Sequence, residues 1–197
     1  KYFTISREDY QLQQERICFT ENLEGALIGV TNRYLDTEGI EMPPLPPYIL
    51  GMYLAEGSVF RKKGKPNPEE GSTHRQRAAT GAQWTIHSVT ISQNAGPIKD
   101  RILAELSAAG FSWRFCGAKN ISFGDVSLGT RLWADCGIGA KNKELPPGFL
   151  GQSDDWIKQV LAGLLDGDGT IADSRIVFDT TSWALACQIM VMIRKLG

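Results

Sequence analysis

Two segments of the sequence, Ile49–Gly57 and Leu161–Gly169, follow the same pattern. In each, two small residues four positions apart come directly before an acidic residue, which is Glu56 in the first segment and Asp168 in the second. The small pairs are Gly51 with Ala55 and Gly163 with Gly167. Because helix positions four apart share a face, each segment predicts a helix with a flat stripe against which another helix can pack closely.

The acidic residues at the two helix ends, Glu56 and Asp168, predict a cation-binding site. A carboxylate at a helix C-terminus is unfavourable by roughly 0.3–1 kcal/mol, because the helix carbonyls point outward there. Its presence at both equivalent positions indicates a compensating cation. If the helices pack through their small residues, Glu56 and Asp168 form an oxygen-rich site suited to Mg²⁺, with positions open for water and phosphate. The alternative, a solvated turn residue in each segment, explains one helix better than it explains the matched pair.

The second segment, Leu-Ala-Gly-Leu-Leu-Asp-Gly-Asp-Gly, resembles the signature of the LAGLIDADG homing endonucleases. The first segment and its approach, with Phe3–Ser6 and Leu45–Gly51, are similar to the form found in endonucleases embedded in inteins. The resemblance implies an α+β fold of two pseudo-symmetric αββαββα repeats packed through these helices. It also implies a monomer with an internal pseudo-dimer that makes site-specific double-strand breaks in DNA. The reaction would be Mg²⁺-assisted phosphodiester hydrolysis, with Glu56 and Asp168 as metal ligands.

A basic residue beside the metal ions is the third element that the resemblance implies. In intein enzymes a lysine precedes an Ile-Pro or Leu-Pro pair upstream of the second motif, and the run Lys143–Pro146 matches. Lys143 is expected to orient or deprotonate the attacking water, or to neutralise the phosphorane, with Lys141 as the alternative. A solvated linker lysine is the competing interpretation. Asp166 corresponds to Leu54 in the first segment, so a cap or packing role is expected for it.

A basic, turn-rich stretch at 61–82 lies between two strand-like segments and predicts a hairpin with a long basic tip. Its cationic side chains are expected to contact DNA phosphates and to give binding a steep salt dependence. These side chains are Arg61, Lys62, Lys63, Lys65, Arg75 and Arg77. Arg114, on a later strand, is expected to reach DNA as well. A solvated loop is the alternative interpretation of the tip.

Local patterns predict the elements that position these residues. Helices are expected at 48–55, 96–109, 130–135, 153–167 and 183–196, and strands at 58–61, 84–92, 111–116, 120–128 and 175–181. Gly57 is expected to cap the first helix and Ser153 to begin the fourth. The predicted organisation is a lead-in segment 1–47, a first repeat 48–140, a linker 141–152 and a second repeat 153–197. Because the second repeat stops before its last strand pair, we expect a segment of something longer, either a truncated gene product or a fragment.

Composition limits the remaining function classes. The net charge is −1, so any DNA surface must come from an uneven distribution of charge. Four cysteines without a Cys-x-x-Cys pair, and only two histidines, favour reduced thiols over a structural zinc site. No apolar run approaches the ~20 residues needed to cross a membrane and no signal-peptide pattern is present, which predicts an intracellular protein without a membrane partner.

Parts of the second motif also resemble other classes of protein. The run Leu164–Ile171 resembles the Asp-x-Asp-Gly-Thr loop of haloacid-dehalogenase-type phosphatases, but that loop requires a long α/β domain after it. An EF-hand is disfavoured because Val177 stands where the bidentate Glu is needed. A non-cleaving LAGLIDADG protein, such as an RNA maturase or a DNA-binding regulator, stays open. The incomplete second repeat favours that alternative, whereas the two retained acids favour cleavage. Protein splicing is not predicted for the segment itself, because it has no His-Asn ending and no nucleophile at its first residue.

Overall fold

The computed structural model describes residues 2–4, 16–18, 41–63, 84–172 and 175–197. The chain divides into two compact units, Lys1–Leu35 and Asp36–Gly197. In the first unit, β1 (Tyr2–Thr4) pairs in antiparallel fashion with β2 (Arg16–Cys18). All other described elements belong to the second unit, which is α+β and contains five described α-helices.

Helix α2 (Pro47–Glu56) begins where the proline run ends, as the sequence predicted. Proline suits this position because its fixed φ fits the helix and its missing N–H needs no partner there. The seven residues from Tyr48 to Leu54 are all buried, so α2 lies in the interior of its unit. Gly57 caps the helix with an extended backbone (φ −91°), and its N–H donates to the carbonyl oxygen of Tyr53. A Cβ on Gly57 would lie 2.6 Å from that oxygen, so glycine is required here for space.

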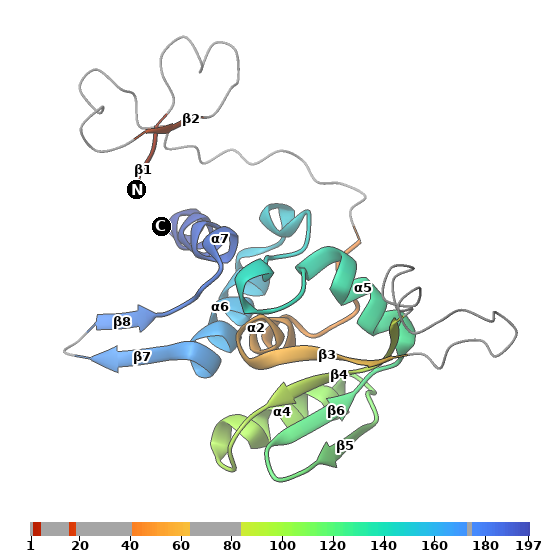
Figure 1. Cartoon of the computed structure of the whole chain (residues 1–197). Helices are drawn as coiled ribbons and strands as arrows, with labels where there is room; N and C mark the ends of the chain where they lie inside the picture. Colours follow the sequence, from red (N-terminus) through yellow and green to blue (C-terminus); the bar gives the residue numbers. More distant parts are fainter. Residues whose placement is uncertain (1, 5–15, 19–40, 64–83, 173–174) are drawn as a thin grey trace, which may run out of the picture. The chain divides into compact units, whose positions relative to one another are not determined.

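Helix α6 (Asp154–Asp168) lies beside α2 (Figure 1). It begins as predicted, because the hydroxyl of Ser153 accepts a hydrogen bond from a first-turn N–H at 3.2 Å. Acidic side chains in the first turn, Asp154 and Asp155, complement the positive end of the helix. One face of α6 is buried and includes Gly163.

The two helices meet backbone to backbone at Gly51 and Gly163. A Cβ on Gly51 would collide with the carbonyl oxygen of Val160 and lie 3.0 Å from the Cα of Gly163. A Cβ on Gly163 would lie 2.8 Å from the backbone nitrogen of Met52. Any side chain larger than hydrogen at either position would therefore push the helices apart. The close packing predicted from the small residues is confirmed.

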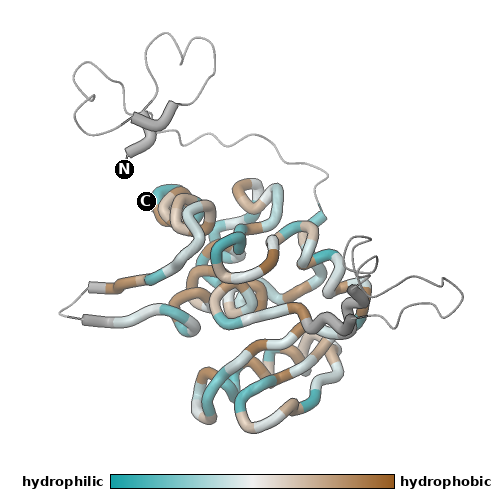
Figure 2. The backbone as a smooth tube through the Cα atoms, viewed as in Figure 1, coloured by the Kyte–Doolittle hydropathy of each residue, from teal (hydrophilic) through white to brown (hydrophobic). Residues whose placement is uncertain are grey.

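A four-stranded antiparallel sheet follows α2 directly, with the order β3-β4-β6-β5. Its strands are β3 (Gly57–Lys63), β4 (Trp84–Ser92), β5 (Trp113–Cys116) and β6 (Asn120–Phe123). Residues with high and low hydropathy are interspersed along these strands (Figure 2). Where β4, β6 and β5 pair, apolar and polar residues alternate, and successive side chains of a strand point to opposite faces, so this part of the sheet has one apolar and one polar face.

The apolar face contributes to the core of the unit. Its buried cross-strand pairs are Val89 with Phe123 and Ile91 with Ile121. They join Ile102 and Leu106 of helix α4 (Pro97–Ala108), which are fully buried. On the opposite face, the hydroxyl of Ser122 donates to that of Ser88 at 2.9 Å, and both serines are buried.

The boundary after β6 differs from the prediction. The strand expected at 120–128 ends at Phe123, and helix α5 (Val126–Cys136) begins four residues before the helix expected at 130–135. Gly124 turns the chain with φ +68°, and the carboxylate of Asp125 accepts a hydrogen bond from the N–H of Leu128 at 2.9 Å. This N-cap starts a helix inside a run that looks strand-like from hydropathy alone.

The second half of the unit contains an element that the sequence did not predict. Strand β7 (Gly169–Ala172) follows α6 without a break and pairs with β8 (Arg175–Phe178). Helix α7 (Trp183–Leu196) follows, with the Ser182 hydroxyl accepting from the N–H of Leu185 at 3.2 Å. Two short 3-10 turns, η2 (Ala140–Asn142) and η3 (Phe149–Gly151), lie in the connection between α5 and α6.

No helix in the described part of the chain is long and apolar enough to cross a membrane.

Candidate metal centre

The ends of α2 and α6 lie against each other and bring Glu56 and Asp168 into one region. A Cβ on Gly167 would collide with the Cβ of Ala55 and lie 3.6 Å from the Cγ of Glu56. The last turns of the two helices are therefore in contact, as expected for helices that already pack closely at Gly51 and Gly163. Directly after each acid the chain becomes extended, so each carboxylate stands at a helix-to-strand junction.

The electrostatics of the two acids are those of negative charges held close together in a partly dehydrated place. Loss of hydration raises the pKa of Glu56, the charge of Asp168 raises it further, and Lys143 lowers it. Loss of hydration also raises the pKa of Asp168, against the lowering effect of Lys143. Since both pKa values lie above their ordinary range, both groups gain when a cation comes between them.

Asp179 is a third acid in this region, which the sequence analysis missed. It follows β8, and Phe178 pairs with Gly169, so Asp179 comes next to Asp168 across the β7–β8 ladder. Its charge raises the pKa of Asp168. The signal was the four-residue segment after Asp168, which pairs with β8 across a short connection. Recognising β7 in the sequence would have placed Asp179 beside the site.

Lys143 is buried, with 5% of its surface exposed, and lies beneath the end of α2. Its ammonium donates to the carbonyl oxygens of Tyr53 and Gly57, the latter at 2.6 Å, and lies 4.2 Å from the centroid of the Tyr53 ring. Its own carbonyl accepts from the Ser182 hydroxyl at 2.5 Å, which ties it to the N-cap of α7. The competing interpretation of Lys143 as a solvated linker lysine is therefore wrong, because these contacts remove its side chain from water.

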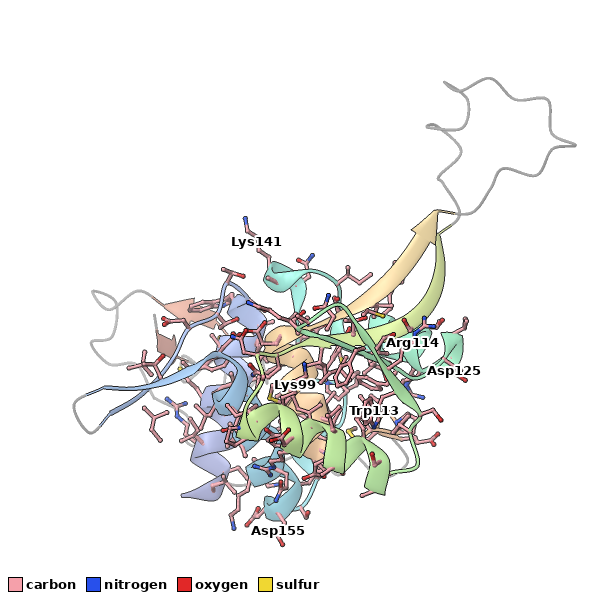
Figure 3. The ribbon with its side chains drawn as sticks, turned by 90° about the horizontal axis from the view of Figure 1, so that it is seen from below. Lys99, Trp113, Arg114, Asp125, Lys141 and Asp155 are labelled. Atoms are coloured by element: carbon pink, nitrogen blue, oxygen red, sulfur yellow. The ribbon has the colours of Figure 1, made fainter. Side chains whose placement is uncertain are left out.

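Burial lowers the pKa of Lys143 from 10.5 to about 8, although Cys136 and the two acids oppose this change. A lysine with such a pKa holds a proton at neutral pH and releases it in mildly alkaline solution. Lys141, the alternative candidate, is exposed on η2 and its side chain projects away from the ribbon (Figure 3). Of the two lysines, Lys143 is the one whose charge acts on Glu56 and Asp168.

The donor set at this place fits Mg²⁺. Among the described residues, no group of three or more His, Cys, Asp or Glu side chains is arranged to hold a metal ion. A divalent ion bound here would rest on the carboxylates of Glu56 and Asp168 and take its other ligands from water, phosphate and backbone oxygens. Mg²⁺ is commonly held in this way, by one or two carboxylates together with substrate phosphates.

The residues predicted to bind DNA are only partly described. Arg114 is exposed on β5, on the polar face of the sheet (Figure 3). Arg61, Lys62 and Lys63 belong to β3, but their side chains lie outside the described part of the structure. Lys65, Arg75 and Arg77 lie outside the described residues altogether.

Comparison with known proteins shows no family for this chain. No family model matches the sequence. A stretch of 57 residues is 40% identical to part of the replicative DNA helicase DnaB of Mycobacterium intracellulare. The matched stretch amounts to 28% of this chain and 10% of the helicase. A match of this length is similarity between segments and carries no assignment of activity.

Proposed function

We propose that this protein is a site-specific DNA endonuclease of the LAGLIDADG homing type, in its intein-embedded form, that makes double-strand breaks by Mg²⁺-assisted phosphodiester hydrolysis. The observation that carries the proposal is the contact of α2 with α6 through Gly51 and Gly163, which brings Glu56 and Asp168 to the same end of the helix pair. A packing role alone gives no reason for two like charges at that place. A shared divalent cation does.

The order of the elements supports two related repeats. The first half runs helix, strand, strand, helix, strand, strand, helix from α2 to α5, and the second begins again with helix, strand, strand, helix from α6 to α7. Gly51 and Gly163 are 112 residues apart, as are Glu56 and Asp168. The contact between α2 and α6 would then be the interface of an internal pseudo-dimer, and the chain would act as a monomer.

The proposed reaction gives each residue of the site one task. Glu56 and Asp168 would hold the cation, which when bound would polarise the phosphate and make nearby water more acidic. The oxygen of a water molecule attacks phosphorus, the bond from phosphorus to one bridging oxygen of the DNA backbone breaks, and the leaving oxygen takes up a proton from solvent. Lys143 in its neutral form accepts the proton that the water loses, and in its charged form it stabilises the developing negative charge. Burial supports both uses, because it keeps the pKa of Lys143 near 8.

The polar face of the sheet is the proposed DNA surface. Thr90, Asn120 and Arg114 share this face with the serine pair described above. Short polar side chains on a twisted sheet can approach base edges in the major groove, while cationic side chains on β3 and its connection to β4 contact phosphates.

Cleavage is tested with the whole chain and a plasmid pool that contains a randomised insert, because the target sequence is unknown. With Mg²⁺, the wild-type protein is expected to linearise a subset of plasmids, and sequencing of the ends gives the site. Glu56→Gln and Asp168→Asn should each abolish cleavage while retaining DNA binding, and Lys158→Gln, on the exposed surface of α6, should cleave normally.

Three outcomes separate the interpretations. Cleavage that requires both acids and Mg²⁺ supports the nuclease. Selective DNA or RNA binding by the wild type without any cleavage replaces it with a non-cleaving protein of the same fold. Absence of both binding and cleavage overturns the proposal. The intein origin is tested separately, by reading the coding sequence on either side of this chain for splicing residues.

A further inference from the structure

A cluster of three side chains joins α2, α4 and α6. Tyr48 comes from the first turn of α2, Arg101 from α4 and Asp166 from the last turn of α6. The Tyr48 hydroxyl donates to Oδ2 of Asp166 at 2.8 Å. Tyr48 is 1% exposed and the side chain of Asp166 is 37% exposed, so this hydrogen bond is partly buried. Burial and the neighbouring Asp166 charge raise the pKa of Tyr48, which keeps the hydroxyl protonated as a donor.

Arg101 of α4 contacts both partners of this hydrogen bond. Its guanidinium carbon lies 3.6 Å from the centroid of the Tyr48 ring, and Nη1 lies 3.6 Å from Oδ2 of Asp166. Its Nη2 donates to Oε1 of Gln159 at 3.0 Å, and Nε lies 3.7 Å from Glu105. Gln159 and Asp166 are seven residues apart, which places them two turns apart on one face of α6. Arg101 therefore contacts α6 at two points that are about half of the helix length apart.

The packing of α2 on α6 requires a contact that fixes the position of one helix along the other. Side chains that interlock between helices normally fix how far one helix can slide or rotate against the other. At Gly51 and Gly163 there are no side chains to interlock. The directional hydrogen bond from Tyr48 to Asp166 restricts how far α2 can slide or rotate against α6. Asp166 is two residues from Asp168, so a change in register at this point moves the acid of the proposed site.

We propose that Tyr48, Arg101 and Asp166 are positioning residues, which set the register of α2 against α6 so that Glu56 and Asp168 share one cation. This inference rests on the proposed function and assigns Asp166 a task distinct from metal binding. A cap or packing role is expected for Asp166 from the sequence, and its contacts with Tyr48 and Arg101 give it a specific one. The consequence is that variants of this cluster alter metal dependence although none of them touches the cation.

The test compares Tyr48→Phe, which removes only the hydroxyl, with Arg101→Gln, which leaves the buried ring in place. Lys158→Gln breaks an exposed ion pair elsewhere on α6 and serves as the matched control. The Mg²⁺ concentration for half-maximal cleavage is expected to rise about 10- to 100-fold in the first two variants, the usual effect of removing a partner that orients metal ligands. It should stay at the wild-type value in the control. Melting temperatures show that each variant is folded.

A second measurement does not depend on cleavage. The Glu56 carboxyl is followed by NMR against pH without metal, because the charge of Asp168 raises the pKa of Glu56. Tyr48→Phe and Arg101→Gln are expected to lower the pKa of Glu56 toward the value that Glu56 has in the Asp168→Asn variant. If the wild type fails to cleave DNA but this change appears, the proposed function is wrong and the positioning role stands. If folded variants leave both the Glu56 titration and the Mg²⁺ requirement unchanged, the positioning role is overturned.

Discussion

Lys143→Met changes the charge at the proposed centre and keeps a side chain of similar length in the same buried space. In the wild type, the ammonium donates to the carbonyl oxygens of Tyr53 and Gly57 and acts on both acids. The substitution therefore separates two roles that one residue could have. A structural cap would show its loss in stability, whereas a catalytic group would show its loss in rate.

The expected change in stability follows from two opposing effects. Burial lowers the pKa of Lys143 from 10.5 to about 8, which corresponds to about 3 kcal/mol against the charged form at neutral pH. Two hydrogen bonds from an ammonium each contribute about 1.5–3 kcal/mol in the opposite direction. Because the two effects are of similar size, Lys143→Met is expected to change the free energy of unfolding at pH 7 by about 3 kcal/mol or less.

The dependence of stability on pH gives a sharper test. The pKa of Lys143 is lower in the folded protein than in the unfolded chain, so the unfolded chain binds more protons between about pH 8 and pH 10.5. Stability therefore rises with pH in that window. Between pH 7 and pH 9.5, the wild type should gain about 2 kcal/mol relative to Lys143→Met. Urea unfolding at both pH values measures this difference, with Lys141→Met as the control from the exposed lysine nearby.

Two results would refute this reasoning in different ways. If the unfolding free energies of the wild type and Lys143→Met change in parallel with pH, the ammonium is not dehydrated as the structure has it. If the difference appears but the variant cleaves DNA at the wild-type rate, Lys143 is a cap of α2 and not the auxiliary base. The expected result is a loss of about 10²- to 10⁴-fold in rate, the usual effect of losing a general base.

Three further predictions test the helix contact and its acids. Gly163→Ala should destabilise the protein by at least about 1–3 kcal/mol, because the added Cβ collides with the backbone of α2, and thermal melting should show no such loss for Lys158→Ala. Asp168→Asn should abolish cleavage but raise stability more at pH 7 than at pH 4. A folded-state pKa that is raised makes the charged carboxylate unfavourable above that pKa, so an equal change at both pH values would contradict it. Asp179→Asn should lower the pKa of Asp168 in an NMR titration, and Asp154→Asn, at the other end of α6, should leave it unchanged.

The parts of the fold that the sequence could predict are those set by local chemistry. The end of the proline run placed α2, and Ser153 with its two acidic neighbours placed the beginning of α6. Small residues at a spacing of four predicted the contact between these helices, because that spacing has a single consequence on a helix surface. Each of these signals lies within one or two turns of the residue that it explains.

The remaining parts depend on contacts between residues far apart in the sequence. Strand β7 has four residues and is recognisable through its pairing with β8, so the position of Asp179 beside Asp168 was missed. The hydrophobic run after Asn120 looked like one long strand, although Gly124 and Asp125 divide it into a strand and a helix. Burial of Lys143 against Tyr53, 90 residues earlier in the chain, leaves no local trace either.

The spacing along the two helices explains why the acids lie at the same end of the helix pair. Glu56 lies five residues after Gly51, and Asp168 lies five residues after Gly163. With a rise of 1.5 Å per residue, both acids lie about 7.5 Å beyond the crossing point, at the same height and on corresponding faces. One residue added between Gly163 and Asp168 would turn the acid by about 100° around α6 and carry it away from its counterpart. The spacing from glycine to acid is thus as essential to the proposed centre as the acids themselves.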